Sequence, residues 1–364
     1  MEWMAPASGI AMCHIGRCEN SQKREPPMDD ITTIGIDLAK SVFQLHGVDA
    51  DGRVLLRRQL RRSQMLEFFQ RQPPCLIGME ACASAHYWAR ELRKLGHDVR
   101  LMQPSYVKGY VKRGKTDQAD AEAICEAVSR PSMRFVPVKS EETQALLMIH
   151  KAREFLVRQQ TQIVNAMRAH LGEFGIVVPK GIHNVERLIM ACEQTDLPAA
   201  AHKALSLLAD QLVDTQKKIE ALTADIRADA RANEAAQRLQ TIPGIGPITA
   251  SALVSALPDV ADFKSGRDLS AWLGLTPKPH STGGKERLGR ISKMGNRYLR
   301  RLLYLGASAQ VSVRRRGEAG EDWLWKIIQR KKPKQAAIAL ANRMARTAYA
   351  LMKNRTEFRA AQAA

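Results

Sequence analysis

The stretch Ile31-Thr-Thr-Ile-Gly-Ile-Asp37 is apolar, rich in β-branched residues and closed by an acid. Such residues favour a buried strand, so the stretch predicts a strand that carries a carboxylate at its end. Two stretches with alternating character follow, Ser41–Val48 and Arg53–Leu60, and the turn sequence Asp49-Ala-Asp-Gly52 separates them. Together the three stretches predict an antiparallel three-stranded meander.

The next stretches alternate between helix and strand. A predicted helix over 63–71 precedes the short apolar strand 75–80, which again ends in an acid, Glu80. A helix over 85–95, a strand over 98–102 and a helix from Thr116 complete the series. This order predicts an α/β domain over residues 30–138, with the strand order of the RNase H fold and with its first and fourth strands adjacent.

The middle of the chain, residues 139–238, predicts two long helices. Apolar residues recur there near a heptad register, which favours an antiparallel coiled coil as much as an ordinary helical bundle. The first run is Ala145, Met148, Ala152, Phe155, Gln159, Ile163 and Ala166, and the second is Leu205, Leu208, Leu212, Thr215, Ile219, Leu222 and Ile226. Residues 172–197 break the two runs.

Residues 239–356 predict a mainly helical domain, with helices near 296–311 and 335–352. We interpret residues 357–364 as a tail. Residues 1–29 are rich in small and polar side chains, lack the pattern of a signal peptide and predict a disordered extension.

The charge of the chain indicates a polyanionic partner. The net charge is +19, and residues 264–364 contain 23 Lys and Arg against 6 Asp and Glu. A binding protein and an enzyme acting on nucleic acid both fit this excess. No apolar run of about 18 residues predicts a membrane span. The six cysteines form no CxxC pair, so reduced thiols in a cytoplasmic protein are favoured over a zinc site at Cys13-His14-x₃-Cys18.

Four acids stand out by position. Asp37 and Glu80 end strands predicted to be neighbours, whereas Asp117 and Asp120 share one face of a predicted helix. Thr116 is the expected N-cap, and a capping role alone would explain Asp117. Four crowded carboxylates repel one another unless a cation is bound. The set therefore predicts a Mg²⁺ or Mn²⁺ site, with two ions about 4 Å apart that assist phosphoryl transfer.

Two glycine-containing segments indicate contacts with a phosphate backbone. Pro243-Gly-Ile-Gly246 between apolar helical segments predicts a helix-hairpin-helix, although a plain corner between two helices uses the same glycines. The loop Ser281-Thr-Gly-Gly-Lys285 lacks the P-loop spacing, and a hydroxyl in such a loop is more often a phosphate donor than a nucleophile. The residues expected to bind nucleic acid are Gly244, Gly246, Gly283, Gly284, Lys285, Arg287, Arg290, Lys293, Arg297, Arg300 and Arg301.

These segments resemble the DEDD transposases of the insertion sequence 110 family, which are related to the Piv and MooV invertases. The Ser-Thr-Gly-Gly-Lys form is similar to that of the 1111 subgroup. The matching pieces run in order over nearly the whole chain. They are Gly35-Ile-Asp37-x-Ala-Lys40, Met79-Glu80-Ala81, Lys115-Thr-Asp117-x-x-Asp120-Ala121, Ile242-Pro-Gly-Ile-Gly246, Gly274-Leu-x-Pro277, Ser281-Thr-Gly-Gly and Ile291-Ser-Lys-x-Gly295.

The resemblance implies an RNase H-like (RuvC-like) domain, a helical connector and a transposase domain. It also implies that Asp37, Glu80, Asp117 and Asp120 hold Mg²⁺ and that a loop serine attacks DNA to form a phosphoserine link. Family members act as dimers or tetramers, in which the acids of one subunit meet the serine of another. They are guided by a structured RNA that pairs with donor and target DNA. In the family the serine directly precedes the first glycine; here Thr282 stands there, and we assign the role to Ser281 with Thr282 as the alternative.

The resulting hypothesis is an RNA-guided transposase or site-specific recombinase, located in the bacterial cytoplasm with the nucleoid. Two alternatives are enzymes: a Holliday-junction resolvase that uses water, and a DNA invertase that needs no RNA. The third is a nucleic-acid-binding protein without catalysis.

Overall fold

The computed structural model describes residues 30–111, 116–194, 196–257, 259–280, 287–317 and 322–359, without the side chains of residues 182 and 194. The chain divides into two compact units, with the boundary between Val138 and Lys139. The expectations for residues 1–29 lie outside the described residues.

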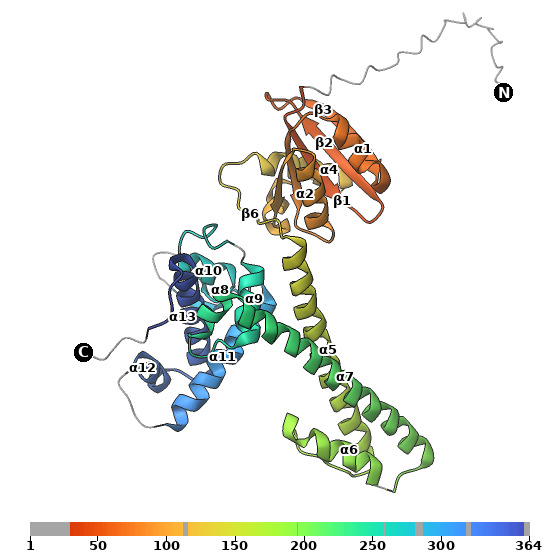
Figure 1. Cartoon of the computed structure of the whole chain (residues 1–364), viewed down its shortest axis with the longest axis vertical. Helices are drawn as coiled ribbons and strands as arrows, with labels where there is room; N and C mark the ends of the chain where they lie inside the picture. The colour runs from red at the N-terminus through yellow and green to blue at the C-terminus, as the bar shows by residue number, and fades with distance from the viewer. Residues whose placement is uncertain are drawn as a thin grey trace, which may run out of the picture. The chain divides into compact units, whose positions relative to one another are not determined.

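Unit 1 is built on a six-stranded mixed sheet of order β3-β2-β1-β4-β5-β6 (Figure 1). The predicted meander is confirmed, because β1 and β3 each pair antiparallel with β2. The predicted adjacency of the first and fourth strands is confirmed too, since β1 and β4 pair in parallel. The strands are β1 (Thr33–Leu38), β2 (Val42–Val48), β3 (Val54–Arg61), β4 (Leu76–Glu80), β5 (Asp98–Met102) and β6 (Phe135–Val136).

Helices cover both faces of this sheet, because successive residues of a strand point to opposite sides. Ile34 and Ile36 of β1 belong to the core that α1 and α2 cover, whereas α4 contacts the other face, on the side of Gly35. The helices of unit 1 are α1 (Met65–Arg71), α2 (Ala85–Lys94), α3 (Pro104–Val107) and α4 (Asp117–Val128), with 3-10 turns η2 (Arg62–Gln64) and η3 (Lys108–Tyr110).

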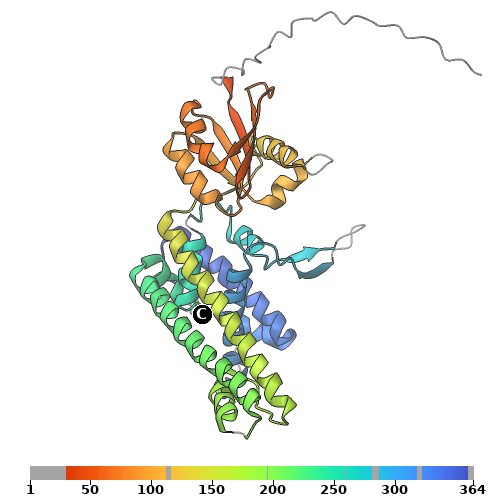
Figure 2. The ribbon, with the colours of Figure 1, turned by 90° about the vertical axis from the view of Figure 1, so that its right-hand side faces the viewer.

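Unit 2 begins with two long helices, α5 (Glu141–Glu173) and α7 (Ala199–Ala232) (Figures 1 and 2). They are antiparallel, because Arg153 of α5 bonds Thr223 of α7 while residues 164–171 pack on residues 205–212. The segment expected only to break the two runs contains a further helix, α6 (Val185–Gln194), whose Leu188 is buried in the same cluster. Despite their length, neither these helices nor any other in the described ranges has an apolar run able to span a membrane.

The expected register is confirmed for α7 and wrong for α5. Leu205, Leu212 and Ile226 are buried as predicted. In α5, however, Met148 and Phe155 are 68% and 53% exposed. The buried residues of α5 are His150, which lies two residues after the predicted Met148, and Val164, Met167 and Leu171, of which the first two lie one residue after the predicted Ile163 and Ala166. In the N-terminal half of α5 the inward-facing residues include His150 and Arg153, which are polar. The periodicity of apolar residues therefore predicted the wrong face of the helix as buried.

In the C-terminal part of unit 2, the described helices α8 to α13 all contribute residues to one core. The predicted helices near 296–311 and 335–352 are confirmed as α11 and α13. The helix α12 and the two-stranded ribbon β7–β8, which stands out from the helices of this unit in Figure 2, were not predicted. The elements are α8 (Glu234–Gln240), α9 (Pro247–Ala256), α10 (Gly266–Trp272), β7 (Pro277–Pro279), β8 (Leu288–Ile291), α11 (Arg297–Arg316), α12 (Trp323–Arg330) and α13 (Pro333–Asn354).

A buried polar network joins the long helices to this core. His150 of α5 is fully buried, and its ring nitrogens lie 3.1 Å from the Tyr298 hydroxyl of α11 and 3.0 Å from the Ser251 hydroxyl of α9. Ser251 in turn donates to a carboxylate oxygen of Asp229 in α7, at 2.7 Å. Burial disfavours the charged imidazole and lowers the pKa of His150 to about 4. Four helices are thus tied together through one neutral histidine.

We predict that His150 makes unit 2 sensitive to acid. Unfolding returns the His150 pKa toward 6.5, so its contribution is complete above that pH and is lost as the pH falls from 6.5 to about 4. The shift corresponds to about 3 kcal/mol in total. Urea unfolding at pH 7.5 and pH 4.5, read by hydrogen exchange in α5 and α9, should therefore show a smaller pH effect in His150→Gln than in the wild type. The exposed His202→Gln is the control, and equal pH effects in all three proteins would contradict the prediction.

Candidate functional site

Two of the predicted acids lie on neighbouring strands at one edge of the sheet. Asp37 is near the end of β1, and Glu80 is the last residue of β4. The parallel pairing sets Ile36 opposite Met79, so Asp37 and Glu80 follow at the same carboxyl edge. Ligand and catalytic sites of open α/β sheets lie at this edge.

The other two acids come from the first turn of α4. Asp117 is exposed and Asp120 is partly buried. The predicted N-cap is confirmed, because the Thr116 hydroxyl accepts a hydrogen bond from the Ala119 amide at 3.2 Å. The cap fixes where α4 begins and therefore where Asp117 and Asp120 stand along the helix axis.

Two glycines let α4 lie directly on the sheet. A Cβ at Gly35 would overlap the Ala121 carbonyl oxygen and the Cys125 amide nitrogen of α4. A Cβ at Gly78 of β4 would lie 2.7 Å from the Val128 Cβ, a separation that real Cβ atoms essentially never show. Only glycine permits this approach of helix and sheet. The close packing sets the start of α4 beside the ends of β1 and β4.

The acids influence one another electrostatically. Burial is the largest cause that raises the pKa of Asp37 above its usual value, and the charges of Asp120 and Asp117 add to it. Burial also raises the pKa of Glu80, followed by the charges of Asp37 and Asp120. The structure therefore brings together four carboxylates from three separate segments, as the sequence predicted. Negative charge accumulates here, and no basic side chain among the described residues lowers the pKa of Asp37 or of Glu80.

The donor set suits a hard divalent cation. Carboxylate oxygens are the ligands that Mg²⁺ and Mn²⁺ prefer, and a bound cation would offset both the burial and the repulsion that raise the pKa values of Asp37 and Glu80. Among the described residues, no three acid, thiol or imidazole side chains already enclose a common point where an ion would sit. Binding of an ion would therefore require these carboxylates to turn toward it.

The loop after Glu80 was not predicted as part of the site. The charges of Glu80 and Asp37 add to burial in raising the pKa of the Cys82 thiol, so this side chain belongs to the acidic edge. Ser84 in the same loop has a φ of 68°, a left-handed conformation that is uncommon outside glycine. The only sequence signal was that Cys82 stands two positions after a strand-end acid.

A basic recess of about 710 Å³ also lies in unit 1, between the ends of β2 and β3 and helix α2. Lys40, Arg61 and Tyr87 line it together with Arg62, whose guanidinium lies 5.1 Å from the centre of the Trp88 ring. Lys40 belongs to the same motif as Asp37. Aromatic and cationic side chains mixed in this way suit a nucleic-acid strand.

Ser281, Thr282, Gly283, Gly284 and Lys285 lie outside the described residues, but the frame that leads to them is described. Strands β7 and β8 pair on either side of the segment 281–286. At their base, a Cβ at Gly274 would overlap the Met294 carbonyl oxygen, and one at Gly295 would overlap that of Trp272. Both glycines have a positive φ, of 70° and 73°. The segment that contains Trp272 and Gly274 and the segment that contains Met294 and Gly295 therefore pack closely against each other beneath the ribbon.

One predicted nucleic-acid contact has a structural role in this frame. The Arg300 guanidinium donates to the carbonyl oxygens of Leu273 and Met294, at 2.8 and 2.9 Å, and so ties the two segments to each other. The other predicted cations of this region are exposed: Arg287, Arg290, Lys293, Arg297 and Arg301.

The predicted glycine hairpin connects α8 and α9, and its two glycines differ. Gly244 has a φ of 92°, and its carbonyl oxygen is packed so closely against Gly306 of α11 that a Cβ at Gly306 would overlap it. This glycine therefore serves packing within the unit. Gly246 is exposed at the start of α9, and no atom of the described residues lies within 4 Å of the place where its Cβ would be. Of the two, Gly246 is accessible to a phosphate.

Comparison with known families accounts for both parts of the chain. Residues 34–176 match the DEDD transposase family of IS110 elements, and residues 236–322 match the Transposase IS116/IS110/IS902 family. A probable family 20 transposase of Pseudomonas aeruginosa is 48% identical over 335 residues, which are 91% of this chain and 99% of the relative. The chain belongs to the IS110 family of transposases. Transposase domains of this DEDD class typically use a divalent metal, in agreement with the chemistry of the acidic edge.

Two further relatives show the breadth of the similarity. The transposase is 37% identical over 342 residues to the transposase for insertion sequence element IS1111A of Coxiella burnetii, covering 93% of this chain and 94% of the relative. It is 25% identical over 268 residues to the pilin gene-inverting protein of Moraxella bovis, covering 72% and 74%. The predicted resemblance to the 1111 subgroup, with inverting recombinases as distant relatives, is confirmed.

We predict that Gly35→Ala in this transposase displaces α4 from the sheet. The added methyl overlaps backbone atoms, which cannot rotate away, so the loss of stability should be about 1–3 kcal/mol or more. DNA cleavage should fall further than stability does, because Asp117 and Asp120 move with the helix. Unfolding temperature and cleavage are measured in parallel with Gly109→Ala, whose Cβ meets no described atom within 4 Å. Equal behaviour of the two variants would refute the role of the close packing.

We also predict that Asp37 destabilises the metal-free transposase at neutral pH. Because the folded state raises the pKa of Asp37, stability is lost as the pH rises from the usual value of 3.8 through the folded value. Asp37→Asn should therefore unfold at a higher temperature than the wild type in EDTA at pH 7.5. Mg²⁺ at about 100 times its dissociation constant should stabilise the wild type by about 2.7 kcal/mol, and the variant by less. Asp51→Asn, an exposed acid in the β2–β3 turn, is the control; the same Mg²⁺ response in all three would contradict the site.

Proposed function

We propose that the chain cleaves and rejoins DNA strands by serine attack at a divalent metal site, guided by a structured RNA. The observation that carries this proposal is the gathering of Asp37, Glu80, Asp117 and Asp120 at one edge of the unit 1 sheet. The strand order and the two parallel pairs support an RNase H-like (RuvC-like) assignment for unit 1. The family membership supports DNA as the substrate.

In this proposal the four acids hold two Mg²⁺ or Mn²⁺ ions. When bound, such ions stabilise the charge that develops on the oxygens of the scissile phosphate and on an attacking hydroxyl. The acids orient the phosphate, and the half-buried positions of Asp37 and Glu80 restrict access of bulk water. His280 directly precedes Ser281 in the sequence, and in this proposal the metal ions of an acidic edge brought to the loop activate the Ser281 hydroxyl.

Ser281 is the proposed nucleophile, with Thr282 as the alternative. Its oxygen forms a bond to phosphorus while the bond from phosphorus to a DNA oxygen breaks. The serine proton is released to water, and the leaving DNA oxygen takes up a proton from water and departs as a hydroxyl. Attack by a hydroxyl of another strand reverses these steps and rejoins the DNA. The rigid base of the β7–β8 ribbon supports this role, because a nucleophile must be held within reach of the phosphate.

The proposed partners are donor and target DNA, the guide RNA and further copies of the chain in a dimer or tetramer. The cationic side chains Arg287, Arg290, Lys293, Arg297 and Arg301 and the accessible Gly246 would contact phosphates in the cytoplasm, at the nucleoid. Guidance by RNA and assembly of acids and serine from different subunits rest on the family resemblance.

DNA inversion without RNA is the second candidate, favoured by the similarity to the pilin gene-inverting protein of Moraxella bovis. The two candidates differ in their need for RNA. Cleavage that survives complete removal of copurified RNA would favour inversion over guided transposition.

We predict that the reaction leaves the protein covalently attached to DNA. Element ends joined to target DNA are incubated with Mg²⁺, RNA and the wild type, Ser281→Ala, Thr282→Ala or Asp37→Ala, and products are separated on denaturing gels. A protease-sensitive adduct should form in the wild type and be lost in Ser281→Ala and Asp37→Ala, with cleavage falling by at least about 10²-fold. Cleavage without an adduct, unaffected by both loop substitutions, would identify a nuclease that uses water.

A further inference from the structure

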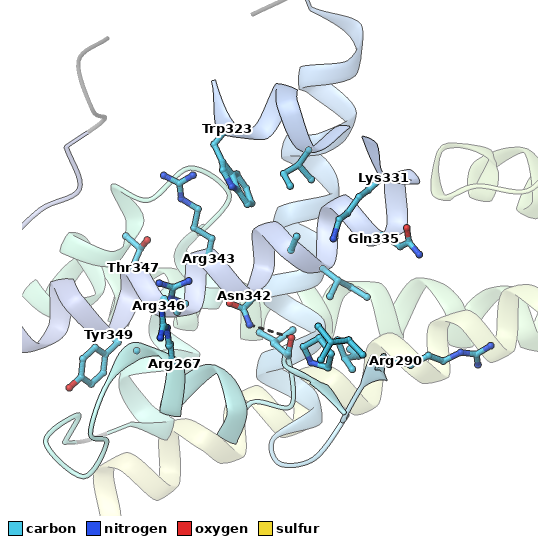
Figure 3. A pocket seen from close by; sticks show the side chains of 18 of the residues that line it. Arg267, Arg290, Trp323, Lys331, Gln335, Asn342, Arg343, Arg346, Thr347 and Tyr349 are labelled. Atoms are coloured by element: carbon cyan, nitrogen blue, oxygen red, sulfur yellow. Dashed lines mark hydrogen bonds between the residues drawn. The ribbon is translucent and has the colours of Figure 1, made fainter. Parts of the chain in front are cut away.

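A large groove in unit 2 takes no part in the proposed chemistry. It measures about 1780 Å³, more than the roughly 300–1,000 Å³ of small-molecule pockets. Figure 3 shows side chains from several elements around it. We call it the basic groove; the lining residues used below are Arg267, Leu275, Arg290, Lys293, Trp323, Ile327, Lys331, Arg343 and Arg346.

The charge of the basic groove fits a polyanion. Six lining residues are cationic, and they come from α10, the β8 strand and the turn after it, the segment after α12, and α13. The described lining contains no Asp or Glu. Cations from segments so far apart in the sequence converge on one groove only through the fold, so they are not the random surface charge of a basic protein. Neutralising several neighbouring phosphates requires this arrangement.

The floor of the groove is apolar and carries an accessible aromatic ring. Leu275 and Ile327 line it, and the ring of Trp323 is 37% exposed. The Arg343 guanidinium lies 4.7 Å from the centre of the Trp323 ring, and Figure 3 shows the two side chains together. An indole with a stacked guanidinium offers flat surfaces to a nucleobase.

These two features distinguish an unpaired strand from a duplex. The bases of a duplex cover one another's faces, so a duplex presents phosphates and needs only charge. An unpaired strand exposes base faces as well, and an apolar floor with an aromatic ring shelters them from water. The combination of cationic rim and apolar floor therefore selects a single strand.

The groove continues into the ribbon that leads to the proposed nucleophile. Pro277 of β7 and Leu288, Gly289, Arg290 and Ile291 of β8 all belong to its lining, and these strands flank residues 281–286. Resting on the proposed cleavage of DNA at this loop, we propose that the basic groove holds an unpaired segment of the DNA strand, with one base stacked on Trp323. Arg343, Arg290 and Lys331 contact its phosphates.

The test measures binding without cleavage. The full-length protein in EDTA is titrated into a labelled 12-nucleotide oligothymidylate, a duplex of equal length and an oligouridylate. Trp323→Leu should weaken binding of the single DNA strand about tenfold, which corresponds to about 1.4 kcal/mol, and change duplex binding less than twofold. Arg343→Gln should reduce the slope of log affinity against log salt by about one.

Trp325→Leu is the matched control. This tryptophan lies on the same helix outside the groove lining, under the Arg314 guanidinium, so its loss should change binding of the single strand less than twofold. Unfolding temperatures of all variants exclude a general loss of structure.

Three outcomes would overturn the inference. Equal weakening of duplex and single strand by Trp323→Leu would assign the groove to duplex backbone, and an effect confined to the oligouridylate would assign it to RNA. No effect of Trp323→Leu in EDTA, while the serine adduct still forms in the cleavage assay, would refute the groove and leave the proposed function standing. Conversely, a stacking effect without any adduct would refute the serine mechanism alone.

Discussion

The contact between α4 and the sheet is the constraint on which the acidic edge depends. The start of this helix stands beside the ends of β1 and β4 only because Gly35 and Gly78 present no side chains to it. The carboxylates that result are partly buried and close enough to repel one another, and burial first and then this repulsion raise the pKa values of Asp37 and Glu80. Packing energy of the helix on the sheet therefore offsets electrostatic repulsion at the site.

Charge is divided between the two units in a way that suits nucleic acid. Unit 1 gathers acids at one edge of its sheet, where a bound cation would neutralise their charge. The C-terminal part of unit 2 is strongly basic. A DNA strand can satisfy both surfaces, since its phosphates bind arginines directly and bind carboxylates through divalent ions. In the proposed function, unit 1 supplies the metal ligands and the C-terminal part of unit 2 holds the strand.

Sequence reasoning succeeded where short-range pattern determines structure. The five longer strands follow from apolar or alternating runs, and the Thr116 cap follows from the helical pattern that begins after it. The positions of Asp37 and Glu80 at one edge follow because the two neighbouring strands β1 and β4 carry them at their ends. It failed where polar residues carry the packing: His150 and Arg153 face the core of unit 2, so the apolar stripe of α5 was assigned to the wrong face. The two-residue strand β6 is too short to show alternation. Trp323 and Arg343 meet only through the packing of α12 on α13, which no local pattern contains.

The residues of the frame beneath the β7–β8 ribbon are constrained by packing, whereas the segment 281–286 contributes none of these constraints. The frame depends on Gly274, Gly295 and Arg300. A methyl group added at either glycine would push apart the two segments that contain them, and loss of the Arg300 guanidinium would remove the hydrogen bonds that join these segments. None of these residues belongs to the segment 281–286. Natural selection can therefore try new residues in that segment, including a hydroxyl displaced by one position, while the frame stays unchanged.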